Sequence, residues 1–408
     1  MQTTAATGAE LIIELDIEQR DGRVVSTRSR LPDHQPHHAR LIGLELAAAA
    51  DYLHSSGPYP RQAYSQLLLA AGRAAGGNPV TLDEQERASI ERQLAAEAAD
   101  IHLYQLMLLW PRALGVDTHR TQYTEHHRRL RSDNSPEESF ELGGELLDLL
   151  AREMLGGFYN NIRYPRSLSE FIDRADRGSV LGEVLRKLLD LGPSQPQQDK
   201  PTPILGELSA AAWLSALGSW PSAEALRAPL FFGEPAETGP LARHAASPLV
   251  HMLLKRGHRL SARLFAKVSE LADCASRLRD PLSDEVAPLL DAAPAGPGVG
   301  IARVNTASGV LLCWLRLAED RIADCAFIPP AAWNFHPQGV FNNEACADTV
   351  ETPAAASLRL SLLALALEPA LLGEIRFIEP DKPDTAAKPE AVARPRAKRS
   401  RDQGTRRR

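Results

Sequence analysis

Apolar residues recur mostly at helical spacing along this chain. Over residues 84–110, one helical face would carry Ile90, Leu94, Ile101, Tyr104 and Leu108. Thr81 and Glu84 have the spacing of a capping box at the start of this helix, and Pro111 and Gly115 are expected to end it. The pattern therefore predicts one long amphipathic helix in the first third of the chain.

Further helical segments follow in the middle of the chain. Ser167 and Glu170 form a second capping-box pattern ahead of an apolar run. Helices are also expected over residues 180–191 and 205–217. The Gly- and Pro-rich stretches 192–203 and 292–300 are expected to be linkers, because both residue types interrupt regular elements.

Two stretches favour hairpins instead. Residues 11–17 and 23–28 flank Asp21-Gly22, a dipeptide typical of tight hairpin turns. Residues 310–317 and 322–328 are rich in β-branched and large apolar side chains and flank an acidic turn. We therefore expect a mainly α-helical α+β fold, a long helical bundle with small hairpins packed on its ends.

An aromatic loop follows the second predicted hairpin. Pro329-Pro330 ends the strand, because proline has no N–H for the ladder. The sequence Trp-Asn-Phe-His-Pro then covers residues 333–337. We expect Trp333 to be buried and the Asn334 side chain to bond backbone groups of its own loop.

Composition and charge favour an intracellular protein with a separate tail. The first residues lack a basic start and an apolar core, and no apolar run approaches the length of a membrane span, so a cytoplasmic protein without membrane insertion is expected. Residues 380–408 carry ten Lys or Arg and four Asp or Glu, a net charge of +6; the whole chain carries −6, so residues 1–379 carry −12. We expect one domain over 1–379 and a basic disordered tail over 380–408. Nucleic-acid binding through this tail is an alternative but is not expected.

Candidate metal ligands are few. The cysteines are Cys274, Cys313, Cys325 and Cys346. None of them forms a C-x-x-C pair, and they do not suggest a disulfide framework. Cys313 and Cys325 are expected to face each other across the second hairpin as core residues. Cys346 is the one that could act as a substitute ligand or a reactive thiol.

A histidine cluster is the other candidate. His34, His37 and His38 form an H-x-x-H-H pattern that could supply two or three ligands to iron or nickel. The alternative is an exposed turn, which Pro36 favours. His126-His127, beside two arginines, is expected to lie on a solvated basic helix face.

The order of these landmarks resembles nickel–iron (NiFe) hydrogenase large subunits. In that family a hairpin also precedes a Pro-x-x-Trp-Asn motif. Residues 237–243 resemble its Gly-Pro-Leu-Ala-Arg segment, in which Gly239 and Pro240 would set a turn and Arg243 would pair with a carboxylate. Residues 110–115, WPRALG, are similar to a run in the non-catalytic HupK/HoxV-type hydrogenase expression/formation proteins.

The same resemblance implies that the metal ligands of the family are absent here. Catalytic large subunits hold nickel and iron with the thiolates of two C-x-x-C motifs. The first would fall in residues 30–40, which contain no cysteine, and the family's Asp-Pro-Cys corresponds to Glu368-Pro369-Ala370. The arginine that precedes the hairpin glycine in the family corresponds to Ser308. The resemblance thus implies a large-subunit fold without catalysis, for which no cofactor is expected.

The function that this resemblance implies is an accessory one. The protein would act as a scaffold or chaperone in the maturation or assembly of a NiFe hydrogenase, with hydrogenase maturation proteins or subunits as partners. Transient binding of iron or an Fe(CN)2CO unit is the cofactor alternative. Two other hypotheses stay open: a diverged metal-binding enzyme that uses His34, His37, His38 or Cys346, and an unrelated interaction protein that acts through its basic tail.

Overall fold

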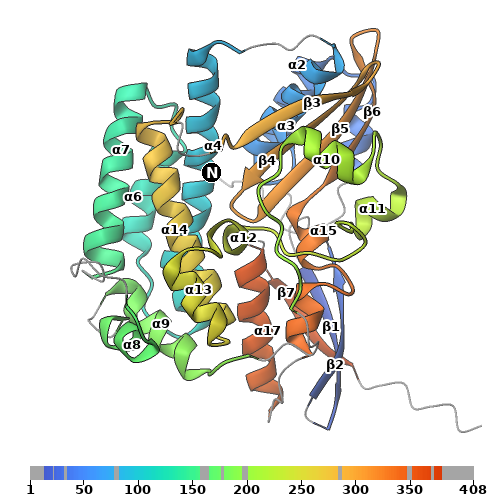
Figure 1. Ribbon diagram of the computed structural model, residues 1–408. Helices are drawn as coiled ribbons and strands as arrows, with labels where there is room; N and C mark the ends of the chain where they lie inside the picture. Colours follow the sequence, from blue (N-terminus) through green and yellow to red (C-terminus); the bar gives the residue numbers. More distant parts are fainter. Residues whose placement is uncertain are drawn as a thin grey trace, which may run out of the picture.

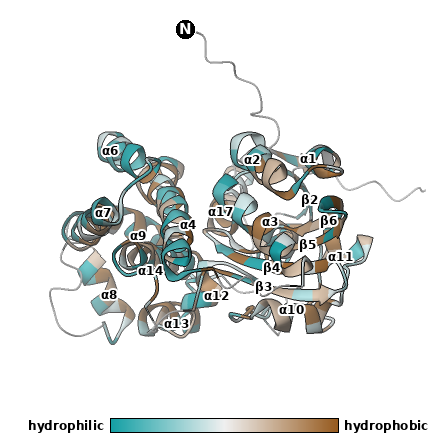
Figure 2. Ribbon diagram, turned by 90° about the horizontal axis from the view of Figure 1, so that it is seen from above, coloured by the Kyte–Doolittle hydropathy of each residue, from teal (hydrophilic) through white to brown (hydrophobic). Residues whose placement is uncertain are grey.

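The computed structural model describes residues 13–21, 23–31, 35–77, 82–156, 165–175, 179–194, 201–283, 287–346, 352–368 and 372–378. Its elements form two parts that lie side by side, a helical body and a part built around two β-sheets (Figures 1 and 2). The predicted tail, and the domain boundary predicted at residue 379, lie outside the described residues. The mainly helical α+β class expected from the sequence is confirmed.

The helical body packs around one central helix, α14. Its elements are α4 (Glu84–Tyr104), η2 (Gln105–Leu109), α5 (Trp110–Ala113), α6 (Arg120–Leu130), α7 (Pro136–Asp148), η3 (Leu149–Met154), α8 (Leu168–Ala175), α9 (Val180–Asp190), α13 (Pro248–Lys255) and α14 (Arg259–Arg279). The segments η2 and η3 are π-helical turns that continue α4 and α7. Most residues of α14 are buried because it packs against both α4 and α7 (Figure 2). None of the described helices is both long and apolar enough to cross a membrane.

The long helix predicted over residues 84–110 is confirmed as α4, but its N-terminal cap and its C-terminal end differ from the prediction. Asp83 caps α4, and its side chain accepts the Glu86 N–H at 2.7 Å. Thr81, the predicted cap, lies outside the described residues. The helical run continues through Pro111 into α5, because a proline is tolerated in the first turn of a new helical segment.

The middle helices are confirmed with one correction. The Ser167 hydroxyl accepts the Glu170 N–H at 3.1 Å, and α9 matches the predicted 180–191 closely. The helix predicted over 205–217 is only α10 (Ala210–Leu217). Leu205 instead donates its N–H to the carbonyl of Glu237 at 2.9 Å, so its backbone pairs with a distant segment before the helix begins.

The sheet-containing part holds the remaining elements. The helices are α1 (Gln35–Leu41), α2 (Leu46–Ser56), α3 (Arg61–Ala75), α10, α11 (Ala223–Arg227), α12 (Pro240–His244), α15 (Pro330–Asn334), α16 (Val340–Ala345) and α17 (Pro353–Leu367). A four-stranded antiparallel sheet consists of β3 (Leu290–Gly296), β4 (Val299–Thr306), β5 (Gly309–Ala318) and β6 (Arg321–Ile328), in that order. The predicted second hairpin is confirmed as β5 and β6, with Glu319 and Asp320 at φ 50° and 63° in its two-residue turn.

The stretch 292–300, predicted as a linker, forms part of β3, a tight turn and the start of β4. The prediction was wrong because alanine, proline and glycine are poor strand formers. Pro294 is tolerated because β3 is an edge strand, where a missing N–H costs little. A Cβ at Gly300 would lie 2.1 Å from the Ala71 carbonyl oxygen, so glycine is what allows α3 to pack directly on β4.

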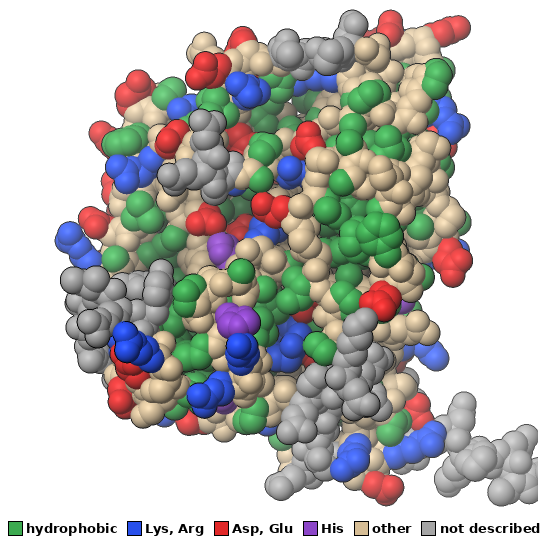
Figure 3. Space-filling model, in the orientation of Figure 1, with side chains coloured by type: hydrophobic (Ala, Val, Ile, Leu, Met, Phe, Trp, Pro, Cys, Tyr) green, Lys and Arg blue, Asp and Glu red, His purple; other side chains and the backbone are tan. Residues whose placement is uncertain are grey.

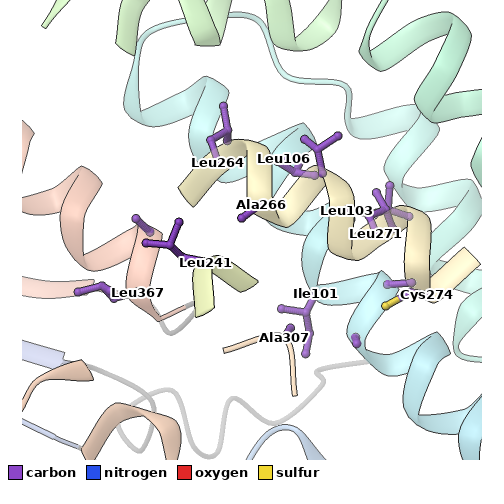
Figure 4. Close-up of a cluster of buried hydrophobic side chains, with 14 of the residues drawn as sticks. Ile101, Leu103, Leu106, Leu241, Leu264, Ala266, Leu271, Cys274, Ala307 and Leu367 are labelled. Atoms are coloured by element: carbon purple, nitrogen blue, oxygen red, sulfur yellow. The ribbon is translucent and has the colours of Figure 1, made fainter. Parts of the chain in front are cut away.

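Both faces of the four-stranded sheet are buried. One face joins the large core that it shares with the helices; Figure 4 shows part of this core around α14. The other face forms a smaller core that contains Trp213, Trp314 and Trp333, and hydrophobic side chains also gather on the surface near α11 and α15 (Figure 3). The predicted picture of a helical bundle with small hairpins on its ends is therefore wrong here, because the hairpin belongs to a central sheet covered on both sides.

The N-terminal hairpin is confirmed and acquires a third strand. β1 (Ile13–Arg20) pairs with β2 (Arg23–Arg30) around a turn with Asp21 at φ 51°. β7 (Leu372–Ile378) runs parallel to β1 on its other side. The Asp16 carboxylate accepts hydrogen bonds from Arg30 and Arg376, both at 2.9 Å. This sheet therefore brings the two ends of the described chain together.

Two sheet edges are covered by other segments. At the edge of β6, Gly43 donates its N–H to the Ile322 carbonyl at 2.8 Å, and Ile322 donates to the Leu44 carbonyl at 2.9 Å. At the edge of β2, the Asn342 side chain on α16 accepts the Thr27 N–H at 3.1 Å. The outward-facing backbone groups of Ile322 and the N–H of Thr27 thus have partners within the chain.

Glu97 links α4 to the start of α3. Its carboxylate oxygens accept the backbone N–H groups of Gln62 and Ala63, each at 2.9 Å. Such N–H groups have no partner within their own helix, so the contact caps α3 from outside. Burial raises the pKa of Glu97 to about 7, although both hydrogen bonds oppose the shift.

This raised pKa predicts a pH-dependent stability. The folded pKa of about 7 lies above the ordinary value of 4.5. The contribution of Glu97 is therefore fully present below pH 4.5 and is lost as the pH rises through 7. Over this window the free energy of unfolding of the wild type should fall by about 3 kcal/mol relative to Glu97→Gln. Urea unfolding of both proteins from pH 4.5 to 8 measures this difference, and parallel pH profiles would contradict it.

Candidate functional site

A cavity of about 730 Å³ lies where the two sheets meet the loops around α11 and α15. Its wall comes from the ends of β1 and β2, from α1 and the start of α3, from β5 and β6, and from the end of α17. Much of the wall is aromatic, including Tyr64, Trp220, Phe327 and Phe335. A concave, largely apolar space of this size with few polar groups has the character of a binding site.

Four polar side chains of the wall form two pairs. Ser308 donates its hydroxyl to Glu368 Oε1 at 2.9 Å. His38 Nε2 lies 3.5 Å from Asp324 Oδ1. These oxygen and nitrogen atoms can hydrogen-bond to an occupant.

Segments that the resemblance assigns to metal-site motifs converge on this cavity. Leu31 and His38 belong to residues 30–40, the predicted place of the first motif, and both line the wall. Ser308 and Glu368 correspond to the family's arginine and to its last motif, and both line it as well. The three stretches are far apart in sequence, and the fold brings them to one place.

One cysteine lines the cavity, and it is Cys325. Cys274, Cys313 and Cys346 are buried elsewhere as free thiols. Burial raises the pKa of Cys325 to about 12 and that of Cys346 to about 11. Both are therefore protonated near neutral pH, whereas the thiolate is the form that binds metal or reacts.

Cys313 and Cys325 do not face each other as predicted. Cys313 pairs with Phe327, and Cys325 pairs with Leu315. A register shift after Arg316 places the two thiols diagonally on the same face of the sheet. A pattern-based register could not include this shift, because it arises within the hairpin.

Two members of the predicted histidine cluster, His37 and His38, have different partners. His37 Nδ1 lies 2.9 Å from the Tyr52 hydroxyl, whereas His38 reaches Asp324. Their rings thus approach different elements, although they are neighbours on α1. His34, Pro369 and Ala370 lie outside the described residues. His127 lies on the largely solvent-facing helix α6, as predicted, with its side chain 42% exposed and its Nδ1 2.7 Å from Asp100 Oδ1.

The donor groups at the cavity do not fit a nickel–iron centre. Such a centre needs several soft, anionic sulfur ligands that can bridge two metals. The described wall offers one protonated thiol together with hydroxyl, carboxylate, imidazole and guanidinium groups. In the described part of the chain, no three His, Cys, Asp or Glu side chains lie close enough to hold a metal ion.

The Trp-Asn loop is buried, as predicted, but Asn334 acts differently. Trp333 is fully buried and lies 5.5 Å from Trp213 between ring centroids. Asn334 Oδ1 accepts the Thr238 N–H at 3.0 Å, and its Nδ2 donates to the carbonyls of Ser308 (3.4 Å) and Leu367 (3.1 Å). The side chain thus joins three distant segments rather than its own loop. Two of them lead directly into the Ser308–Glu368 pair.

The turn around Gly239 supports the same wall. Gly239 has φ 124°, and a Cβ there would lie 2.8 Å from the Ser308 carbonyl oxygen, so the close approach requires glycine. Pro240 begins α12. Arg243 pairs with Glu270 at 2.8 Å, as predicted, and donates to the Thr306 carbonyl at 2.9 Å. The contacts of Gly239, Pro240 and Arg243 are thus contacts within the fold.

A buried ionic cluster on α14 was missed by the sequence analysis. Arg263 donates to both carboxylate oxygens of Glu237, at 2.8 and 2.9 Å, and to those of Glu344, at 2.7 and 2.6 Å. Arg259 also contacts Glu344. Burial alone would raise the pKa of Glu344, but Arg263 and Arg259 lower it to about 2. The available signal was basic residues every four positions, at 259, 263 and 267, within an apolar helix.

Comparisons with known proteins support the fold and nothing beyond it. No protein-family model matches this chain, and no curated protein matches its sequence. The reduced, active Ni-Fe-Se hydrogenase of Desulfomicrobium baculatum is similar in structure, with a TM-score of 0.56, 13% identity, and coverage of 87% of this chain and 95% of that chain. The as-isolated oxidised Ni-Fe-Se hydrogenase of Desulfovibrio vulgaris Hildenborough gives a TM-score of 0.55, 13% identity, and coverage of 86% and 94%. This chain therefore has a hydrogenase large-subunit-like fold.

Proposed function

We propose that this protein is a non-catalytic scaffold or chaperone in the maturation or assembly of a NiFe hydrogenase. One observation carries the proposal. Three segments that correspond to parts of the family's metal site meet at a single cavity. Ser308 stands there in place of the arginine, Glu368 in place of the aspartate of the last motif, and His38 lies in the stretch of the first cysteine motif, which has no cysteine here. A large-subunit-like fold with such a wall is suited to binding and not to nickel–iron chemistry.

The fold suggests how such a protein would work. A mimic of a large subunit presents a similar surface to the proteins that act on that subunit, so it can hold maturation proteins or hydrogenase subunits during assembly. The cavity is the place where an assembly intermediate or a segment of a partner would be held. Asn334, Gly239 and Arg243 keep its wall rigid through contacts between distant segments.

Metal content separates this proposal from a diverged enzyme. We expect no stoichiometric nickel in the purified protein, because the cavity lacks thiolate ligands. Elemental analysis of the full chain, purified with and without air, measures this. About one nickel per chain would contradict the proposal and revive the hypothesis of a metal-dependent enzyme.

Deletion and complementation test the accessory role itself. Deleting the gene should lower the hydrogenase activity of the cells, and the wild-type gene should restore it. Cys325→Ser should restore it equally, since a scaffold does not need the single thiol of the cavity wall. Unchanged hydrogenase activity after deletion would refute the proposal. A Cys325→Ser protein that folds but fails to restore activity would favour metal or thiol chemistry instead.

A further inference from the structure

Three fully buried polar side chains between α4 and α14 lack hydrogen-bond partners. His102 and Gln105 are 0% exposed, and Lys267 is 1% exposed. Both ring nitrogens of His102, both amide atoms of Gln105 and the Lys267 ammonium have no partner. Burying such groups without hydrogen bonds is costly, and most of all for a charge, so each of them calls for a partner.

Helix geometry places two of these groups together. His102 and Gln105 are three positions apart and share one helix face. Gln105 begins the π-helical turn η2, a local irregularity that is frequent at functional sites. α14 packs against α4, and in Figure 4 Leu103 and Leu106 lie beside Leu264 and Leu271. Leu264 and Leu271 are three positions before and four positions after Lys267, so they share a helix face with it.

Electrostatics also connect His102 with Lys267. Burial is the main cause that lowers the pKa of His102, to about 3, and the Lys267 charge lowers it further. His102 is therefore neutral and carries one N–H that can donate. Together the three side chains offer an ammonium, an amide NH2 and an imidazole N–H.

Lys267 differs from the buried arginines around it. Arg243 lies 2.8 Å from a carboxylate oxygen of Glu270. Arg263 lies 2.8 Å from Glu237 and 2.6 Å from Glu344. Lys267 contacts none, and the carboxylates that act on it through space are Glu368 and Glu270. Glu368 accepts from Ser308, and Glu270 is paired with Arg243. The N–H groups of the Lys267 ammonium thus have no hydrogen-bond acceptor among the described residues, and no carboxylate there is in contact with its charge.

We propose that Lys267, His102 and Gln105 bind one small monovalent anion, of which chloride is the representative. Three kinds of N–H donor satisfy such an ion, and its charge balances the ammonium. The surrounding leucines disfavour sulfate or phosphate, which are larger, doubly charged and more strongly hydrated. The site is separate from the cavity and does not depend on the proposed function.

Unfolding in different sodium salts tests this site. A ligand that binds only the folded state raises the folding equilibrium constant in proportion to its concentration above the dissociation constant, so the free energy of unfolding grows with the logarithm of that concentration. At constant ionic strength, replacing gluconate by chloride should stabilise the wild type. Each tenfold rise in chloride above the dissociation constant should raise its folding equilibrium constant about tenfold. Lys267→Met should show no difference between the salts, whereas Lys255→Met, which removes an exposed lysine of α13, should respond like the wild type.

Two results would overturn the proposal. Equal stability of the wild type in chloride and gluconate would mean that only water satisfies these groups. An undiminished chloride response in Lys267→Met would place the ion elsewhere. If Lys267→Met does not fold, crystals of the wild type grown in bromide decide the matter. An anomalous peak among the three side chains is expected, and its absence would refute the site.

Discussion

Arg263→Met lowers the free energy of unfolding by about 3–5 kcal/mol, the usual cost of removing one member of a buried ionic cluster. Arg263 is 2% exposed, and its partners Glu237 and Glu344 are 1% and 5% exposed. Without the guanidinium, both carboxylates stay in an apolar interior, and only Arg259 remains to compensate them. Chemical denaturation of the full chain measures the loss.

A matched control and a compensating variant sharpen this prediction. Arg152→Met removes an exposed arginine paired with Asp148, and it should change the stability by less than about 0.5 kcal/mol. The double variant Glu237→Gln and Arg263→Met should regain much of the loss, because it leaves Glu344 paired with Arg259 and no buried carboxylate of the cluster without a counter-charge. A loss of less than about 1 kcal/mol for Arg263→Met would show that the cluster is not buried as described.

Trp333→Ala is expected to cost about 3–5 kcal/mol, the range for a large aromatic side chain removed from a core. Its ring is fully buried in the smaller core against Trp213, and the next residue, Asn334, joins three segments of the cavity wall. The variant should therefore loosen the wall as well as the core. Urea unfolding gives the stability, and hydrogen exchange at the Ser308 and Thr238 amides reports on the wall.

Trp220 provides the comparison. It lines the cavity, is only half-buried and stacks with Arg316 at 4.7 Å from its ring centroid. Trp220→Ala should cost clearly less than Trp333→Ala and leave the exchange at Thr238 unchanged. An equal cost for the two variants would mean that Trp333 is no anchor of this wall, and the hydrogenase-like geometry of the loop would lose its physical support.

Local patterns were sufficient where one interaction dominates. The turns at Asp21 and at Glu319-Asp320 follow from short-range chemistry, and so do the Ser167 cap and the start of α9. The burial of Trp333 follows from its size and its flanking prolines. These features could be predicted because the residues that decide them are neighbours in sequence.

Features that depend on distant partners could not be predicted. The hairpin at 292–300 packs closely under α3 at Gly300, and nothing within those nine residues indicates that contact. Asn334 was assigned to its own loop because asparagine often bonds nearby backbone, but its partners are 26, 33 and 96 residues away. In the sequence, the basic residues of α14 are typical of a solvated helix face. Only the folded structure shows that Glu237 and Glu344 pair with them. The cavity itself combines segments from both ends of the chain.

The covered sheet edges limit how this protein can bind other proteins. Gly43 and Leu44 occupy the hydrogen-bonding side of β6 around Ile322, and Asn342 does so for part of β2. Partners that recognise a protein by adding a strand need such an edge free. At these positions neither a foreign peptide nor a second copy can pair with the strand, which protects that part of each edge from one route to aggregation. Recognition here must rely on the shape and chemistry of side chains, where a single substitution can change the choice of partner without disturbing the fold.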